Sequence, residues 1–297
     1  MRNKIMYIVF GMLLIFGFVK TSAKGIDDNT LNLIIESQKI DTNSIWKGFE
    51  LEKYPIDVNY GKSEFRYYYG ETIKKQPDIM VLALSAINTE IGPVIKVIPE
   101  AQVRKVIDKG DLSLEERNKI YKSVLVHEAF HCFQMENGAA GINVDSGNIK
   151  SEDLDDFKKY SELLKRIDKN ETFQNLWIKE MADLELYHKT GESDAWATSR
   201  AVRLAFEKDF FGEDYDIFRK YVNDRELIEG TARYVEEASL VIMKYDAKTE
   251  FSGQFINGDE KYYRSGCLKA NILDNEKEWK EIRFDGSISL DDLLLSD

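Results

Sequence analysis

The sequence of 297 residues holds few cysteines and prolines, and less positive than negative charge. Two cysteines, Cys132 and Cys267, are too few for a disulfide framework, and they leave open either one disulfide in an oxidising compartment or two buried thiols. Four scattered prolines, without an internal repeat or a low-complexity tract, leave no candidate linker between domains. The net charge of -12 argues against nucleic acid or an anionic membrane as the main partner.

Only the first residues form a long apolar run. Arg2 and Lys4 precede the apolar stretch 5–19, and small residues end the segment at Ala23, which is the layout of a secretory signal peptide. The stretch is shorter than the roughly 20 residues that a membrane span needs. We therefore expect cleavage after residue 23 and export to the periplasm or the exterior. The alternative is an uncleaved N-terminal anchor, which alone would bring the protein to a membrane.

Short β-rich runs and long helical patterns occupy different parts of the remaining chain. A helix is predicted for residues 28–40, and β-rich runs between residues 46 and 98 predict a small sheet of three to five strands. These runs are PIDVNY, EFRYYYG, DIMVLALSA and PVIKVIPE. We predict an α+β fold in which residues 24–297 form one domain, with a sheet-containing lobe at 24–111 and a larger helical lobe at 112–297.

The helical part begins with a clear start signal. Ser113 and Glu116 form a capping box, in which each side chain satisfies a free backbone amide of the other residue. The helix that they open is expected to end at Asn137, with Gly138 as the glycine that follows a helix. Further helical segments are predicted at 151–167, 171–189, 194–210, 214–245 and 258–275, followed by 278–284 and a short closing segment at 290–295.

Two of the three histidines lie four residues apart in SVLVHEAFHCFQ, residues 123–134. On a helix, His127 and His131 continue an apolar stripe formed with Ile120, Val124 and Met135, so both rings are expected to point inward. Each buried imidazole without a partner costs about 1–3 kcal/mol. One Zn²⁺ shared by both rings satisfies them together, which makes His127 and His131 candidate zinc ligands.

Glu128 follows the first histidine directly. One residue further along a helix, its side chain is rotated by about 100°, which places it beside a metal ion rather than on it. From there a carboxylate can take a proton from water and pass it to a leaving group. His-Glu-x-x-His is a zinc-hydrolase signature for this reason, and Glu128 is the predicted general base.

A third ligand is required, and Glu229 in DRELIEGTARYVEE is the candidate. Gly230 is costly within a helix, by about 1 kcal/mol relative to alanine, which indicates that a second ligand-bearing helix packs closely there. Periodicity alone fits a solvated helix face equally well, since Glu229 also pairs with Arg233 at i, i+4. The remaining histidine, His188, is expected at the surface.

The two motifs together resemble the gluzincin-type zincin metallopeptidases, and in particular bacterial peptidase-MA-like proteins that couple HExxHxxQ to an EGxAxYVE helix. The segments at 46–60 and 262–284 are similar to the flanks of such proteins. The resemblance implies a zincin-like fold, His127, His131 and Glu229 as zinc ligands and Glu128 as the base. Where better-known gluzincins place an aspartate that orients a histidine, this sequence has Arg233. Two other carboxylates stay open as ligands, Glu180 and Glu226.

The late segment with Tyr262, Tyr263 and Arg264 is a candidate source of the donor that stabilises a developing oxyanion. Tyr263 is the residue that we choose, and packing of these aromatic side chains is the alternative. An edge of the predicted sheet is available for an extended peptide.

The predicted function is that of an exported zinc-dependent hydrolase, a metallopeptidase acting on peptides or proteins with zinc-activated water and Glu128. Two rival interpretations remain. In the first, the protein binds zinc without turnover and acts as a binding or assembly factor. In the second, it is an interaction protein that holds no metal.

Overall fold

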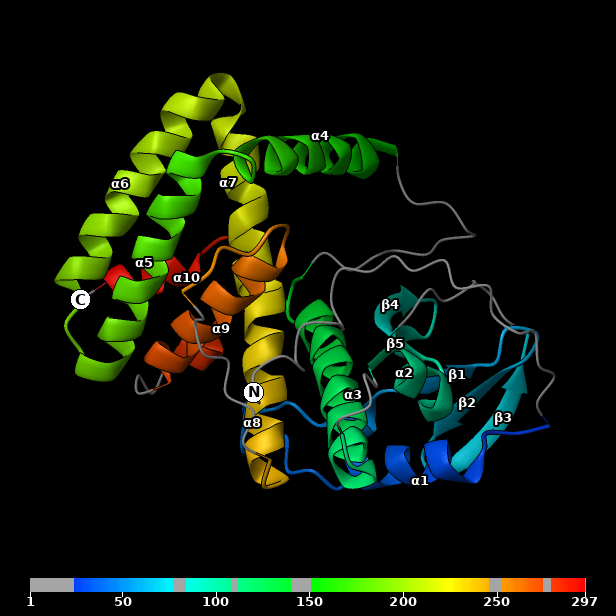
Figure 1. Cartoon of the computed structure of the whole chain (residues 1–297). Coiled ribbons are helices and arrows are strands. Elements are labelled where there is room, and N and C mark those ends of the chain that lie inside the picture. The colour runs from blue at the N-terminus through cyan, green and yellow to red at the C-terminus, as the bar shows by residue number, and fades with distance from the viewer. Residues whose placement is uncertain are drawn as a thin grey trace. The chain divides into compact units, whose positions relative to one another are not determined.

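The computed structural model describes residues 24–76, 84–107, 112–139, 151–245, 253–274 and 279–296 (Figure 1). The chain divides into two compact units, Met1–Asn148 with Val235–Ala247 and Ile149–Tyr234 with Lys248–Asp297. The predicted signal peptide at 1–23 lies outside the described residues. Among those that are described, no helix combines the length and the hydropathy needed to cross a bilayer.

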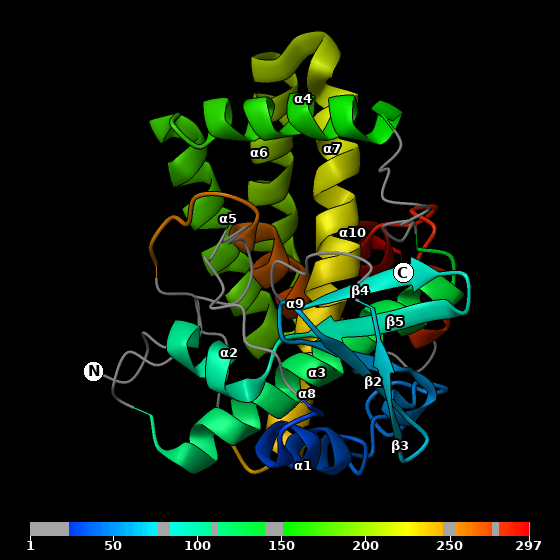
Figure 2. The same ribbon diagram turned by 90° about the vertical axis from the view of Figure 1, so that its right-hand side faces the viewer.

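The first unit combines a mixed sheet with helices, in agreement with the predicted α+β class. Its strands form the order β3-β2-β1-β5-β4, in which β1 and β5 are parallel and the other neighbours are antiparallel (Figure 2). The helix α3 packs against β4 and β5, and α1 packs against α3. The elements are α1 (Asp28–Ser37), η1 (Leu51–Lys53), β1 (Ile56–Asn59), β2 (Glu64–Tyr68), β3 (Glu71–Lys75), β4 (Ser85–Thr89), β5 (Gly92–Val97), α2 (Glu100–Ile107) and α3 (Leu114–Glu136).

The sheet holds five strands, at the upper end of the expected range. Strand β3 was not expected, because its sequence ETIKK is polar and four of its five residues are exposed at the edge of the sheet. The run DIMVLALSA was predicted as a strand, but its residues up to 83 lie outside the described residues, and β4 begins at Ser85. Helix α2 was also not anticipated.

One face of the sheet carries a buried group of charged side chains. Lys96 on β5 donates to Glu64 at 2.7 Å and lies 3.0 Å from Asp57. Arg66 donates to Asp57 at 2.6 Å, and Lys75 approaches the same carboxylate at 3.1 Å. Burial raises the pKa of Asp57, but the Arg66 hydrogen bond and the Lys96 charge outweigh it and hold the pKa below its ordinary value. The buried charges therefore compensate one another, as burial requires.

Helix α3 forms as its sequence predicts but is buried more widely than expected. Ser113 caps it in a capping box with Glu116, and Gly138 after its end has a φ of 108°, which a glycine adopts without strain. Val124 and His127 of the predicted stripe are buried as expected, and the burial extends beyond the stripe, since every residue at 123–130 is buried. Phe130 packs on Trp46 and Phe49, with ring centroids 5.0 and 5.2 Å apart.

The second unit is helical. Helices α5 and α6 pack side by side (Figure 1), and an aromatic core with Tyr160, Trp177, Trp196, Phe218 and Tyr262 holds the unit together. Its elements are α4 (Ser151–Ile167), α5 (Glu171–Thr190), α6 (Asp194–Phe211), η2 (Gly212–Asp214), α7 (Tyr215–Asp224), η3 (Arg225–Gly230), α8 (Thr231–Ile242, which continues into the first unit), α9 (Glu260–Leu273), η4 (Trp279–Glu281) and α10 (Leu290–Leu295).

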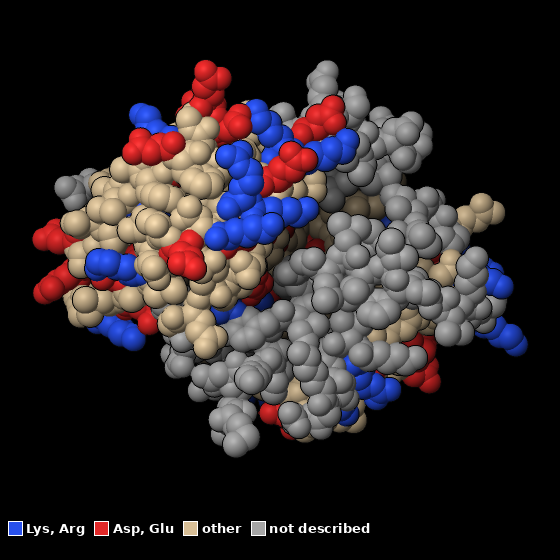
Figure 3. All heavy atoms as spheres, turned by 45° about the horizontal axis from the view of Figure 1, so that its top comes forward, with Lys and Arg blue, Asp and Glu red and all other residues tan. Residues whose placement is uncertain are grey.

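Most of these helices match their predicted bounds within one or two residues. Helical structure is continuous over 215–242, as expected for 214–245, but η3 is a π-helix rather than an α-helix. The segment 278–284 forms only a short turn of 3-10 helix. Acidic and basic side chains lie next to one another on the face drawn in Figure 3.

Gly230 allows a close helix approach, but its partner differs from the one predicted. A Cβ atom at Gly230 would lie 2.5 Å from the Cα atom of Gly266, and the three heavy atoms nearest to it all belong to α9. The glycine is therefore explained by the packing of α9 against η3, and not by a second ligand-bearing helix. The prediction of close packing is right, and the prediction of its partner is wrong.

We expect Gly266→Ala to destabilise the protein. The new Cβ would overlap the carbonyl oxygen of Glu226 and lie 2.8 Å from the Cα atom of Gly230, and both contacts are with backbone that cannot rotate away. Overpacking of this kind costs about 1–3 kcal/mol. The measurement is the free energy of unfolding in denaturant. Gly25→Ala, which meets no atom within 4 Å, is the control, and equal stability of the two variants would contradict the packing described here.

Candidate metal centre

His127 and His131 direct their Nε2 atoms toward each other. The residues are one helical turn apart on α3, so their side chains share a face. The two Nε2 atoms are 3.0 Å apart, and the ring planes are inclined by 79°. His127 is 1% exposed, whereas His131 is half-buried. The pair presents two ring nitrogens to one small volume, which is the convergence that a shared metal ion needs.

The other nitrogen of each ring faces an oxygen atom. Gln134 Oε1 lies 2.7 Å from His131 Nδ1, and Glu236 Oε2 on α8 lies 3.2 Å from His127 Nδ1. A neutral imidazole that carries its proton on Nδ1 has a lone pair on Nε2. A ring that carries its proton on Nε2 instead can donate it to the other Nε2 across the 3.0 Å that separates them. Histidine metal ligands typically show this pattern of one nitrogen held from outside and one directed inward.

Glu229 supplies a carboxylate near the two ring nitrogens. The candidate ligand atoms of His127, His131 and Glu229 all lie within 4.8 Å of one another. Glu229 precedes Glu236 by seven residues, which is about two helical turns, so both carboxylates lie near the same side of a continuous helical stretch. Two imidazoles and one carboxylate form a donor set that catalytic zinc sites use. Their role as ligands stays a prediction.

The spacing of the nitrogens also fits a tetrahedral ion. Zinc–nitrogen bonds are about 2.0–2.1 Å long, and a tetrahedral angle then separates two ligand nitrogens by about 3.3 Å. The observed 3.0 Å between His127 Nε2 and His131 Nε2 corresponds to a somewhat narrower angle. The two histidine nitrogens fit Zn²⁺ in type and in spacing.

Glu128 and Cys132 are the other chemically reactive side chains of this part of α3. Glu128 directly follows His127 and is 3% exposed, so its carboxylate is largely removed from bulk water. Cys132 and Cys267 are both buried free thiols, which leaves the disulfide alternative unsupported. Burial raises the pKa of the Cys132 thiol, with a further contribution from Glu128, so the thiol stays protonated and is a poor metal ligand.

The carboxylates left open as alternative ligands have other partners. Glu226 accepts hydrogen bonds from Ser265 Oγ at 2.6 Å and from Lys269 Nζ at 2.7 Å, one on each carboxylate oxygen. Glu180 accepts from the guanidinium of Arg203, with one contact at 3.1 Å. These interactions favour Glu229 as the third candidate ligand. His188 is exposed in the last turn of α5, where a surface residue was expected.

A buried chain of ion pairs fixes Glu226 and thereby the segment η3. Lys269 on α9 contacts Asp291 on α10 at 2.6 Å in addition to Glu226. Asp291 also lies 2.7 Å from Arg200 Nε on α6. Burial raises the pKa of Asp291, but the charges of Lys269, Arg200 and Arg219 outweigh it, so the pKa lies below its ordinary value and the carboxylate stays ionised. The helix that carries Glu229 is therefore tied to three other helices of the second unit.

The candidate oxyanion donors have different surroundings. Tyr262 is fully buried in the aromatic core, where its ring meets Trp177 at 5.2 Å. Arg264 contacts Glu260 at 3.1 Å. Tyr263 is half-buried, and its pKa is raised by burial and next by the charge of Glu229. The role of Tyr263 as the donor stays a prediction.

Three residues near the site were not assigned a role from the sequence. Gln134 stands three residues after His131, so its helical spacing was a usable signal. Glu236, and not Arg233, is the residue whose carboxylate faces His127 Nδ1. Glu236 follows Glu229 by seven residues, and no local sequence pattern indicates this contact. Arg225 lies 3.8 Å from Glu229 and was also not assigned a role.

No family model matches the chain, and no match is found among curated proteins or solved structures.

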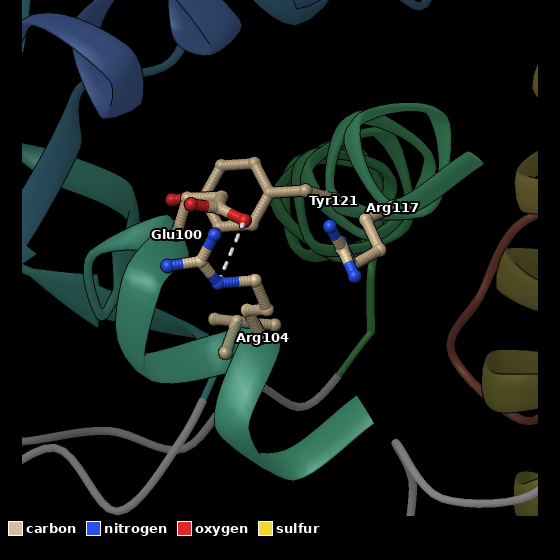
Figure 4. A pocket seen from close by; sticks show the side chains of 5 residues that line it. Glu100, Arg104, Arg117 and Tyr121 are labelled. Carbon is tan, nitrogen blue, oxygen red and sulfur yellow. Dashed lines mark ion pairs between the residues drawn. The ribbon is translucent and has the colours of Figure 1, made fainter. Parts of the chain in front are cut away.

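A small pocket between α2 and α3 is separate from these residues. Its lining includes Glu100, Arg104, Arg117 and Tyr121, and Glu100 and Arg104 form an ion pair at 4.0 Å on the α2 side (Figure 4). The free volume is about 10 Å³, which is room for about one water molecule. The pocket is therefore too small for a substrate.

We expect Glu236→Ala to weaken metal binding without abolishing it. The substitution removes the oxygen that faces His127 Nδ1, and loss of such an orienting group typically costs about 10–100-fold in metal affinity. Competition with a chromophoric chelator measures the affinity. Glu115→Ala, which changes an exposed glutamate of α3, is the matched control. Unchanged affinity in Glu236→Ala would show that the carboxylate does not orient the histidine.

Proposed function

We propose that the protein is a zinc-dependent hydrolase, a metallopeptidase of the zincin type. The observation that carries this proposal is the convergence of His127 Nε2 and His131 Nε2 with the Glu229 carboxylate, with Glu128 directly beside the first histidine. The α+β architecture is compatible with the zincin-like fold that the sequence resemblance implies. The substrate class is a peptide or protein, reached after export by the N-terminal segment.

Each residue has a defined task in this proposal. A bound Zn²⁺ supplies Lewis-acid chemistry, which polarises a carbonyl oxygen and lowers the pKa of water. Gln134 shares a hydrogen bond with the outer nitrogen of His131, and the Glu236 carboxylate faces the outer nitrogen of His127 at 3.2 Å, which favours the present orientation of both rings. Glu128 accepts a proton from the attacking water and returns it to the leaving amine. Tyr263 donates a hydrogen bond to the developing oxyanion.

The first test is the zinc content of purified protein. We expect about one zinc per chain in the wild type, and a loss of tightly held zinc in His131→Ala and Glu229→Ala, because each substitution removes one of three candidate ligands. Mass spectrometry of the metal content after dialysis measures the stoichiometry. Glu115→Ala, at an exposed glutamate of α3, is the comparison for an acidic residue outside the donor set. Full zinc retention by Glu229→Ala would remove that residue from the ligand set, and wild type without zinc would refute the proposal.

The second test separates catalysis from binding. Glu128→Gln keeps the size of the side chain but not its basicity, so we expect peptide cleavage to fall by about 10²–10⁴-fold while zinc remains bound. Cleavage of a peptide library, followed by mass spectrometry, is the assay. A wild-type protein that holds zinc but cleaves none of the library would instead identify a catalytically silent zinc-binding protein. Equal activity of wild type and variant would exclude Glu128 as the base.

A further inference from the structure

Arg225 is a positively charged side chain that does not use all of its N–H donors in hydrogen bonds within the residues that the structure describes. It belongs to the second unit, like Glu229, and opens the segment η3 four residues before it. Its Nη1 atom lies 3.8 Å from Glu229 Oε1, and its Nε atom lies 3.7 Å from Asp259 Oδ2. Both distances exceed those of hydrogen bonds. Within the described part of the chain, the buried Nε atom has no hydrogen-bond partner.

This arrangement differs from that of the structural arginines nearby. Arg203 is fully buried and donates to both Glu180 and Glu207. The Arg225 side chain is 27% exposed, so part of it is accessible from solvent. Asp259, the carboxylate on its other side, already accepts a hydrogen bond from the hydroxyl of Tyr160. Arg225 thus lies between two carboxylates without a hydrogen bond to either, and part of its side chain is accessible from solvent.

An incoming carboxylate matches these donors. Guanidinium presents its N–H groups in a planar fork that a carboxylate accepts with two parallel hydrogen bonds. Glu229 adjoins Arg225, with Oε1 at 3.8 Å from Nη1. A group bound by Arg225 would therefore lie beside the carboxylate that we assign to the metal, at the position where the end of a short peptide or an acidic side chain next to the scissile bond would be placed.

We propose that Arg225 binds a carboxylate of the peptide substrate and thereby selects substrates with a negative charge close to the scissile bond. The inference rests on the proposed peptidase function and extends it to a substrate class. The carboxylate has two possible sources, the free C-terminus of the substrate or an aspartate or glutamate side chain. Arg225 acts as a specificity-determining residue that touches the substrate.

The experiment compares three matched random hexapeptide libraries. The first has free C-termini, the second is amidated, and the third is amidated and has asparagine and glutamine in place of aspartate and glutamate. Cleavage by the zinc-loaded full-length protein is followed by mass spectrometry. We expect at least one carboxylate-bearing library to be cleaved about 10–100-fold faster than the third, as the loss of a charge-assisted hydrogen bond implies. Preference for the first over the second identifies the C-terminus, and preference for the second over the third identifies the side chain.

Two substitutions assign the preference to Arg225. In Arg225→Gln the preference should disappear, so that the carboxylate-bearing libraries are cleaved no faster than the third. In Arg225→Lys, which keeps the charge but not the fork, the preference should decrease without disappearing. Arg104→Gln is the control, because Arg104 is also an accessible arginine with a weak ion pair, at 4.0 Å from Glu100, but lies on α2. Zinc content and circular dichroism confirm that each variant is folded.

The outcomes separate this inference from the proposed function. If wild type cleaves all three libraries equally, or if Arg225→Gln slows all of them by the same factor, the inference is overturned while the peptidase proposal stands. If wild type cleaves none, the peptidase proposal fails. Retention of the three libraries on the immobilised protein then tests whether Arg225 binds a carboxylate. Retention of a carboxylate-bearing library by wild type but not by Arg225→Gln supports the inference, and equal retention overturns it.

Discussion

The backbone contact between α9 and η3 is the constraint on which the position of Glu229 depends. Gly230 and Gly266 face each other without side chains, and a Cβ atom on either would overlap the opposite backbone. The close approach also brings Ser265 and Lys269 within hydrogen-bond reach of Glu226. The close packing against α9 and the buried ion pair of Glu226 therefore both fix the six-residue segment η3, which also contains Glu229.

Electrostatics imposes a second constraint on α3. Glu236 Oε2 lies 3.2 Å from His127 Nδ1 and Gln134 Oε1 lies 2.7 Å from His131 Nδ1, so each ring faces an oxygen on its outer side. The two Nε2 atoms lie 3.0 Å apart, and which ring donates to the other depends on the tautomers. Both rings therefore direct their inner nitrogens toward one small volume.

Local signals in the sequence were sufficient for helices and insufficient for contacts between elements. The Ser113 capping box and the bounds of α4 and α10 were predicted correctly because caps and periodicity are encoded within a few residues. Strand β3 was missed because a polar edge strand has no hydrophobic alternation. His127, His131 and Glu128 are readable from one helix, whereas Glu229 needed the resemblance, and the contact of Glu236 with His127 depends on tertiary packing.

The π-helical winding of η3 explains how three neighbouring charged residues acquire different surroundings. In an α-helix, Glu226 and Glu229 would be about 60° apart around the axis and would compete for the same partners. A π-helix, closed by i→i+5 hydrogen bonds, rotates less per residue and separates them further. Glu226 can then turn to Lys269 on α9 while Glu229 lies beside Arg225. Changing this segment to a regular α-helix would therefore redirect Glu229 without altering its chemistry.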